Sequence, residues 1–234
     1  MSLLNINNLN SGYGNKQILF DASLGIEEGD VVLLIGSNGS GKSTLLKTIC
    51  GIIPVWSGSI KYDGVMFQTK EKASPTHTLL KQGIQYMPQK NELFDDATVM
   101  ENLQFSLLHL NNEKETAKRI EELLEEIPSL KPMLKQRAAK LSGGERKKLC
   151  LGMVMVNHPR LLLYDEPLAG MSDDNIPDMI EMLTKLRTTG TTMLIVEHHV
   201  TEMMLFADKT YGMQLGSLSG EPLQTIEEIK EIMI

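Results

Sequence analysis

The residues from Gly36 to Thr44, GSNGSGKST, form a glycine-rich loop of the type that holds phosphate groups. They match G-x-x-x-x-G-K-[ST] and lie between an apolar strand-like run and the start of a helix, the setting that this loop requires. The backbone amides can approach a phosphate closely, Lys42 is expected to reach the β- and γ-phosphates, and Ser43 is expected to bind Mg²⁺. The loop predicts a nucleoside triphosphate site built from Gly36, Asn38, Gly39, Ser40, Gly41, Lys42, Ser43 and Thr44.

Two adjacent acids close an apolar run further along, in LLLYDEP. A carboxylate at the end of a buried strand beside a phosphate loop is placed to hold Mg²⁺ through water, which assigns Asp165 to the metal site with Ser43. Because successive strand side chains point to opposite sides, Glu166 is expected to face the γ-phosphate. There it would act as a general base toward the attacking water, a role worth about 10²–10⁴ in rate.

A second phosphate-binding feature occurs in LSGGERKKL, at Ser142, Gly143 and Gly144. These residues stand at the expected start of a helix, where free N–H groups and the positive end of the helix dipole attract anions. The chain therefore carries two phosphate-binding features about a hundred residues apart. A single nucleotide site would need only the first of them, so the second requires a separate role.

The elements that must position these motifs follow from the spacing of apolar residues. Residues 18–26 alternate as a half-buried strand, and a helix is expected to begin at Ser43 and end at Gly51. Further elements are expected as strands 31–35, near 60, 83–87, 160–164, 192–196 and 209–214, and as helices 143–156, 175–188 and 199–206. Strands that alternate with helices predict a parallel α/β sheet.

The stretch from Thr98 to about residue 139 interrupts this alternation and is expected to be helical. Thr98 and Glu101 form a capping box, and Asn112 can cap a helix that Pro128 stops. The polar segment 68–78 before it is expected to be an exposed loop. We therefore predict one domain over residues 1–234, with an α/β core at about 1–88 and 141–234 and a helical subdomain at about 89–140.

Composition and charge exclude several function classes. A net charge of −7 does not suit a nucleic-acid surface, so no nucleic-acid partner is expected. The longest apolar runs fall far short of the roughly 20 residues that span a bilayer, and no signal peptide is visible, so direct membrane insertion is not expected. Cys50 and Cys150 lack metal-type spacing and are expected to be free, buried thiols in a reducing compartment, which indicates a cytoplasmic protein.

Together the motifs resemble the ATP-binding cassette (ABC) family of transporter ATPases. The P-loop, the DEP strand and LSGGE occur in that family's order, with Ser142 placed 23 residues before Asp165 (165 − 142 = 23). A P-loop alone is shared with GTPases, kinases and motors, whereas its combination with LSGGE is specific. The resemblance covers roughly residues 3–215. It implies ATP and Mg²⁺ as cofactors and a P-loop NTPase fold of ABC type, with a RecA-like parallel sheet core, an N-terminal antiparallel β subdomain and an inserted α-helical subdomain.

The resemblance assigns roles that spacing alone does not. Gln89, after GIQYMP, resembles the Q-loop glutamine that contacts Mg²⁺ and the attacking water. His198, after MLIVE, resembles the switch histidine that senses the γ-phosphate, and the family's order favours it over His199. Tyr13, in SGYG, resembles the aromatic residue that stacks on adenine. The chain departs from the family at Ser172, where the D-loop often carries an Asp, so the cross-dimer contact of that Asp is in doubt.

The resemblance also implies a dimer, which would be homo- or heteromeric. Two subunits would sandwich two ATP molecules, and Ser142, Gly143 and Gly144 of one chain would cap the γ-phosphate held by the partner's P-loop. This arrangement explains the two phosphate-binding features, since each would complete half of a composite site.

Transmembrane permease chains are the second implied partner, and they would place the chain at the cytoplasmic face of a membrane. They are expected to contact about Gln89–Thr98, where Leu93 and Phe94 are either docking residues or ordinary packing. The motifs DEPLAG-x-S, TVMENL and LIVEH resemble those of the ATPases of branched-chain amino acid importers and related urea or amide importers. This resemblance implies import of amino acids or similar small polar solutes.

Two other functions stay open at this point. A soluble ABC ATPase, such as one for iron–sulfur cluster assembly, is also a small single cassette. DNA-handling members insert long coiled coils, whereas only 53 residues separate Gln89 from Ser142 (142 − 89 = 53) and they show no sustained heptads. A P-loop kinase or GTPase has no use for LSGGE, and the chain lacks an obvious NKxD motif. The substrate and the direction of transport also stay open, because the cassette does not touch the substrate.

Overall fold

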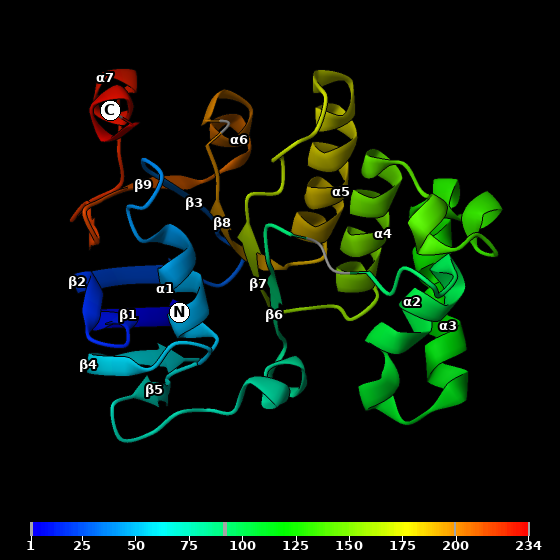
Figure 1. Cartoon of the computed structure of the whole chain (residues 1–234), viewed down its shortest axis with the longest axis horizontal. Coiled ribbons are helices and arrows are strands. Elements are labelled where there is room, and N and C mark those ends of the chain that lie inside the picture. The colour runs from blue at the N-terminus through cyan, green and yellow to red at the C-terminus, as the bar shows by residue number, and fades with distance from the viewer. Residues whose placement is uncertain (1, 91–92, 199, 234) are drawn as a thin grey trace.

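The computed structural model describes residues 2–90, 93–198 and 200–233, and within these ranges the strands form two sheets (Figure 1). The first sheet is antiparallel, and its strand order is β2-β1-β4-β5. Its members are β1 (Ser2–Tyr13), β2 (Lys16–Glu27), β4 (Val55–Tyr62) and β5 (Val65–Thr69). Register shifts along β1 mark irregular pairing that bends these long strands.

The second sheet has the order β10-β9-β3-β8-β7-β6 and is parallel except at β10. Its central strands are continuous apolar runs, which suits a parallel sheet covered on both faces. The members are β3 (Val31–Ile35), β6 (Ile84–Met87), β7 (Leu161–Asp165), β8 (Thr192–Val196), β9 (Lys209–Gln214) and β10 (Ser217–Leu218).

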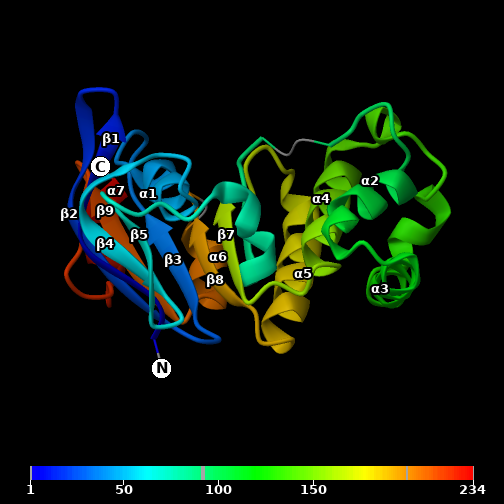
Figure 2. The ribbon, with the colours of Figure 1, turned by 90° about the horizontal axis from the view of Figure 1, so that it is seen from below.

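The helices divide into those that accompany the parallel sheet and those set apart from it (Figures 1 and 2). The first group is α1 (Lys42–Ile49), α4 (Gly143–Met155), α5 (Ile176–Thr188), α6 (Val200–Phe206) and α7 (Ile226–Met233). The second group, α2 (Val99–Ser106) and α3 (Glu113–Glu126), lies beyond α4 at the end of the molecule far from the antiparallel sheet. The 3₁₀ turns are Thr76–Thr78, Leu80–Gln82, Leu108–Leu110, Pro128–Met133, Ala138–Lys140 and Asp173–Asn175.

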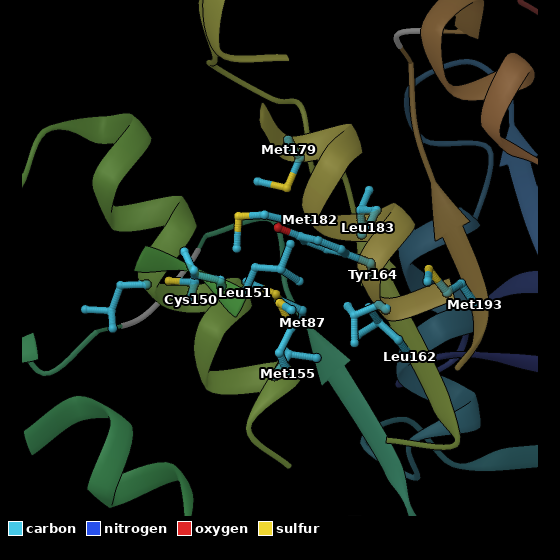
Figure 3. Packing of buried hydrophobic residues seen from close by; sticks show 14 of the residues in the cluster. Met87, Cys150, Leu151, Met155, Leu162, Tyr164, Met179, Met182, Leu183 and Met193 are labelled. Atoms are coloured by element: carbon cyan, nitrogen blue, oxygen red, sulfur yellow. The ribbon is translucent and has the colours of Figure 1, made fainter. Parts of the chain in front are cut away.

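Alternate residues of β3 enter two different cores. Leu33 belongs to the core under α4 and α5, whereas Leu34 belongs to the core shared with α1 and the antiparallel sheet. Burying one such side chain contributes roughly 1.5–3 kcal/mol, so the sheet is held from both faces. Figure 3 shows the first core at the level of β7, where side chains of α4 and α5 gather about Tyr164.

Local signals set the ends of the helical elements. Thr98 and Glu101 form the expected capping box, the Asn112 side chain accepts from the amides of Lys114 and Glu115, and α3 ends just before Pro128. A connection from Thr98 to Arg137 by an isolated bridge closes the base of this helical insertion.

The fold class predicted from the sequence is confirmed, although β1, β5 and α7 lie in stretches for which no element was predicted. The segment 68–78 is largely exposed, as expected, but it begins at the end of β5, where Gln68 is 2% exposed and its side chain accepts from the amide of Ser74. The helix expected over 199–206 is observed from Val200, and residue 199 lies outside the described part of the chain. Within the described ranges, no helix is both long enough and apolar enough to cross a membrane.

Candidate active site

The phosphate loop joins β3 to α1, and its glycines are required by the backbone. Gly36 has φ 156°, and a β-carbon there would lie 2.2 Å from the carbonyl oxygen of Met213. Gly41, the N-cap of α1, has a left-handed φ of 112°. The loop therefore passes close to neighbouring backbone and presents the start of α1, a combination that suits anion binding.

Lys42 is buried against the loop that it belongs to. Its Nζ donates to the carbonyl oxygens of Gly36 at 2.8 Å and Ser37 at 3.0 Å. Burial lowers the pKa of this ammonium, and the charges of Glu166 and Asp165 act in the opposite direction. The side chain is thus held by neutral carbonyl acceptors that a charged phosphate can replace.

Ser43 and Asp165 meet although 122 residues separate them. The Ser43 Oγ donates to Asp165 Oδ1 at 3.0 Å, between the first turn of α1 and the end of β7. Burial raises the pKa of the Asp165 carboxyl, while the Ser43 hydrogen bond lowers it. A hydroxyl and a carboxylate oxygen at this separation are the hard oxygen donors that Mg²⁺ prefers.

A Mg²⁺ ion bound together with a nucleotide needs few ligands from the protein. Among the residues that the structure describes, no group of three or more His, Cys, Asp or Glu is arranged to hold a metal ion. Mg²⁺ in nucleotide sites is characteristically bound by one or two protein groups together with water and phosphates. The Ser43 and Asp165 pair fits that mode.

The Glu166 carboxylate is the point at which two other predicted residues converge. Gln89 donates through Nε2 to Glu166 Oε2, and His198 Nε2 lies 3.0 Å from Glu166 Oε1. Their strands β6, β7 and β8 are adjacent and parallel, so their carboxyl ends open at one edge of the sheet. The structure therefore brings Gln89, Glu166 and His198 together, whereas His199 lies outside the described residues.

The orientation of Glu166 has a different cause from the predicted strand alternation. Strand β7 ends at Asp165, and Glu166 has a left-handed φ of 53° with its amide donating to Val196 O. A non-glycine residue in that conformation is uncommon, and it turns the side chain across the sheet edge. Asp165 and Glu166 have different partners, and the turn after the strand, instead of the predicted pleat, separates them.

The LSGGE motif starts α4 as predicted. The Ser142 Oγ accepts from the Glu145 amide at 3.3 Å, and Glu145 Oε2 accepts from the Ser142 amide at 2.7 Å, which completes a capping box. The hydroxyl acts as an acceptor there, so its O–H remains able to donate. The backbone at Gly143 faces open space, since a β-carbon built there meets nothing within 4 Å.

The signature motif and the P-loop stay apart in this chain. The starts of α1 and α4 lie on opposite sides of β7 in both views (Figures 1 and 2). Among the described residues, no hydrogen bond or ion pair joins Ser142 or the two following glycines to the loop Gly36–Thr44. The two phosphate-binding features predicted from the sequence are therefore separate within one chain.

Tyr13 ends β1 and is 50% exposed, so its ring is free to stack. A shallow hollow of about 500 Å³ lies beside the P-loop residue Gly39. It is lined by Lys16, Gln17, Ile18, Phe20, Gly39, Leu215 and Gly216. The sequence gives no signal for residues 215 and 216 at this place, because the pairing of β9 with β3 and the hydrogen bond from the Gly216 amide to Ser40 O bring them to the loop.

The stretch expected to dock a permease divides into two kinds of residue. Leu93 packs against the core, whereas Phe94 is 57% exposed and makes an edge-on ring contact with Phe105 at 4.9 Å. Asn102 fixes this loop, because its side chain both donates to and accepts from the Phe94 backbone. Residues 91–92 of the stretch lie outside the described part of the chain.

The departure at Ser172 has a local structural role. The Ser172 Oγ accepts from the Asn175 side chain at 2.7 Å, at the start of the 3₁₀ turn Asp173–Asn175. Asn175 in turn packs against Gly144, whose β-carbon would lie 3.2 Å from Asn175 Oδ1. This segment therefore touches the signature motif of its own chain.

Comparison with known proteins gives relatives along nearly the whole chain. The chain is 33% identical over 233 residues to the high-affinity branched-chain amino acid transport ATP-binding protein BraG of Pseudomonas aeruginosa, covering 98% of each. It is 35% identical over 212 residues to the probable branched-chain amino acid transport ATP-binding protein LivF of Archaeoglobus fulgidus, covering 90% and 88%. It is 30% identical over 243 residues to the lipopolysaccharide export system ATP-binding protein LptB of Haemophilus influenzae, covering 100% and 98%.

Structural and family comparisons agree with these relatives. A solved ATP-binding cassette of an ABC transporter in its ADP conformation matches with a TM-score of 0.85 at 27% identity, covering 100% of this chain and 95% of that one. The family model described as ABC transporter matches residues 19–169. The resemblance inferred from the sequence motifs is confirmed: the chain belongs to the ABC transporter family, as an ATP-binding and ATP-hydrolysing subunit.

Proposed function

We propose that this chain powers an importer of amino acids or similar small polar solutes, and that Glu166 is its catalytic base. The convergence of Gln89 and His198 on the Glu166 carboxylate is the observation that carries the hydrolytic part. A carboxylate with two fixed partners beside a phosphate loop is oriented before the substrate arrives, which is the condition for efficient proton abstraction.

In this proposal the attacking water gives its proton to Glu166. Gln89 would orient that water and contact the metal, and His198 would bond to the γ-phosphate while it holds the carboxylate in place. Ser43 and Asp165 would hold Mg²⁺. When bound, the metal would neutralise charge on the β- and γ-phosphate oxygens.

Nucleotide binding would use the loop from Gly36 to Thr44 and the half-exposed ring of Tyr13. Backbone amides of the loop would surround the phosphates, and Lys42 would exchange the carbonyl oxygens of Gly36 and Ser37 for phosphate oxygens. This exchange replaces neutral acceptors by charged ones, which strengthens the hydrogen bonds. The hollow beside Gly39 would receive the base and ribose.

A second copy or a related subunit would complete each site. The free O–H of Ser142 and the open backbone of Gly143 suit a γ-phosphate that approaches the start of α4 from outside. Their separation from the P-loop of the same chain supports a nucleotide held by the partner. ATP would therefore control dimerisation, and hydrolysis would release it.

The permease would contact the chain near Gln89–Thr98 at the cytoplasmic face of the membrane. Phe94 and Phe105 form an exposed aromatic pair there, and Gln89 at the beginning of the stretch touches Glu166. In this scheme residues 89–140 form the helical subdomain that transmits nucleotide state to the permease.

The relatives support amino acids as the substrate class. Similarity to BraG and LivF favours import of branched-chain amino acids or close analogues. Similarity to LptB favours lipopolysaccharide export as the second candidate. The motif DEPLAG-x-S alone does not distinguish amino acid import from lipopolysaccharide export.

Purification of the tagged chain from its native membranes tests the proposal. We expect an integral membrane protein to co-purify, and ATP-driven uptake of a branched-chain amino acid after the complex is reconstituted into vesicles with its binding protein. Uptake should stop when Glu166 is replaced by Gln. Lipid extraction without amino acid uptake would favour the export function, and a soluble partner instead of a permease would contradict a transport role.

A further inference from the structure

The residues directly after Glu166 are held by two charged side chains from distant elements. The Lys147 Nζ, on α4, donates to Pro167 O at 2.6 Å and Ala169 O at 2.5 Å. Between these carbonyls, the Leu168 amide donates to Glu197 Oε1 at 2.6 Å. Polar backbone groups of three consecutive residues are thus bound by side chains located 20 or more positions away in the sequence.

Glu197 connects this segment to the switch histidine. Its second oxygen, Oε2, accepts from the His198 amide at 2.6 Å, so one carboxylate bridges the backbones of Leu168 and His198. The residue is 1% exposed at the end of β8. A buried carboxylate is tolerated only where hydrogen bonds satisfy it, and this one spends both oxygens on backbone amides.

Lys147 connects the same segment to the signature motif. It lies little more than one helical turn after Ser142, in the helix that Ser142 caps. Burial lowers the pKa of the Lys147 ammonium, and the negative charge of Glu197 opposes that effect. The two charged groups therefore attract each other across the segment. Replacing such a residue by a neutral one leaves two backbone carbonyls without their donor.

The geometry points to Lys147 and Glu197 as positioning residues that make Pro167–Ala169 a mechanical link. The link joins His198, the γ-phosphate sensor of a chain's own ATP site, to the start of α4, which caps the ATP of the partner. This inference rests on the dimer described under the proposed function. A shift of His198 moves the Glu197 carboxylate and Leu168, and Lys147 passes the movement to Ser142. Hydrolysis in one site thereby loosens the cap on the other.

Hydrogen exchange tests the link without requiring a dimer. At a dilution where the chain is monomeric, Glu197→Gln should raise exchange of the Leu168 and His198 amides about tenfold, because glutamine offers one acceptor for two donors. Mg²⁺ with a non-hydrolysable ATP analogue should alter exchange at residues 142–147 in the parent chain and in the control Lys148→Met. Lys148, the next residue of α4, pairs with Asp178 of α5 and not with the Pro167–Ala169 backbone, so its replacement leaves the link intact.

The decisive variant is Lys147→Met, which keeps the aliphatic stem and removes the donor. Nucleotide should no longer change exchange at residues 142–147, and Lys147→Arg should restore the response. In the dimer, the Hill coefficient for ATP should fall toward one, with monomer ATP affinity within about twofold of the parent. A response that persists in Lys147→Met, or a Hill coefficient equal to that of Lys148→Met, overturns the link. A parent chain that never dimerises with ATP would instead refute the proposed dimer, while the exchange data on the monomer still test the link.

Discussion

Replacing Glu166 by Gln removes the charge on which Gln89 and His198 converge while it keeps the shape of the side chain. The amide oxygen can still accept from Gln89, and the new NH₂ can donate to His198, so both contacts of the parent structure have a counterpart. The substitution is therefore expected to change the chemistry and to preserve the architecture of the site.

The magnitude follows from the role assigned to the carboxylate. A positioned base contributes about 10²–10⁴ in rate. At 1.36 kcal/mol for each factor of ten, this range equals about 2.7–5.4 kcal/mol of activation free energy. ATP affinity should stay within about twofold, because the glutamine makes no new contact with the loop Gly36–Thr44.

Single-turnover hydrolysis by Glu166→Gln, with ATP binding measured in parallel, checks this prediction. The variant should also accumulate as a dimer in Mg²⁺ and ATP, visible by size-exclusion chromatography. Hydrolysis within about threefold of the parent rate would refute Glu166 as the base. A loss of ATP affinity equal to the loss of rate would show that the residue binds nucleotide instead.

Other predictions concern the metal site, the signature glycines and the thiols. Burial raises the pKa of Asp165, so the ionised carboxylate destabilises the nucleotide-free fold. Asp165→Asn should therefore raise the apparent unfolding temperature at pH 7, by a difference that vanishes as the pH falls below 3.8, and a lower unfolding temperature at pH 7 would contradict this cause. The same substitution should weaken Mg²⁺–ADP binding, measured by calorimetry. The added methyl group of Gly143→Ala would lie in open space and raise helix propensity, so the unfolding temperature should stay equal or rise. ATP-driven dimerisation should nevertheless weaken at least about tenfold. Unchanged dimerisation would argue against a phosphate at this backbone. Burial raises the pKa values of Cys50 and Cys150 to about 12, so iodoacetamide at pH 8 should modify both only after urea unfolding, and rapid modification of the native chain would refute their burial.

Much of the fold was predictable because its signals are local. The alternation in residues 18–26, the capping boxes at Thr98 and Ser142 and the stop at Pro128 depend on neighbours within a few positions. The P-loop and the Ser43–Asp165 pair also followed, since strand order and loop chemistry together restrict where they can lie.

The remaining features depend on contacts that no short pattern encodes. The left-handed backbone of Glu166 and the burial of Gln68 are set by tertiary packing. The bridge from Glu197 to Leu168 joins residues 29 positions apart. The separation of partly buried Leu93 from exposed Phe94 depends on Asn102, which lies on the next helix.

Mixing two inactive variants tests most directly the claim that each ATP site is composite. Lys42→Ala disables the P-loop of one chain, and Ser142→Arg blocks the signature motif of another. Each variant alone should lack ATPase activity. In a mixed dimer, the intact P-loop of one chain faces the intact signature of the other, so equal mixing should restore up to about a quarter of the parent rate. Mixed dimers captured through two different tags, yet without activity, would contradict the claim, as would activity in Ser142→Arg alone.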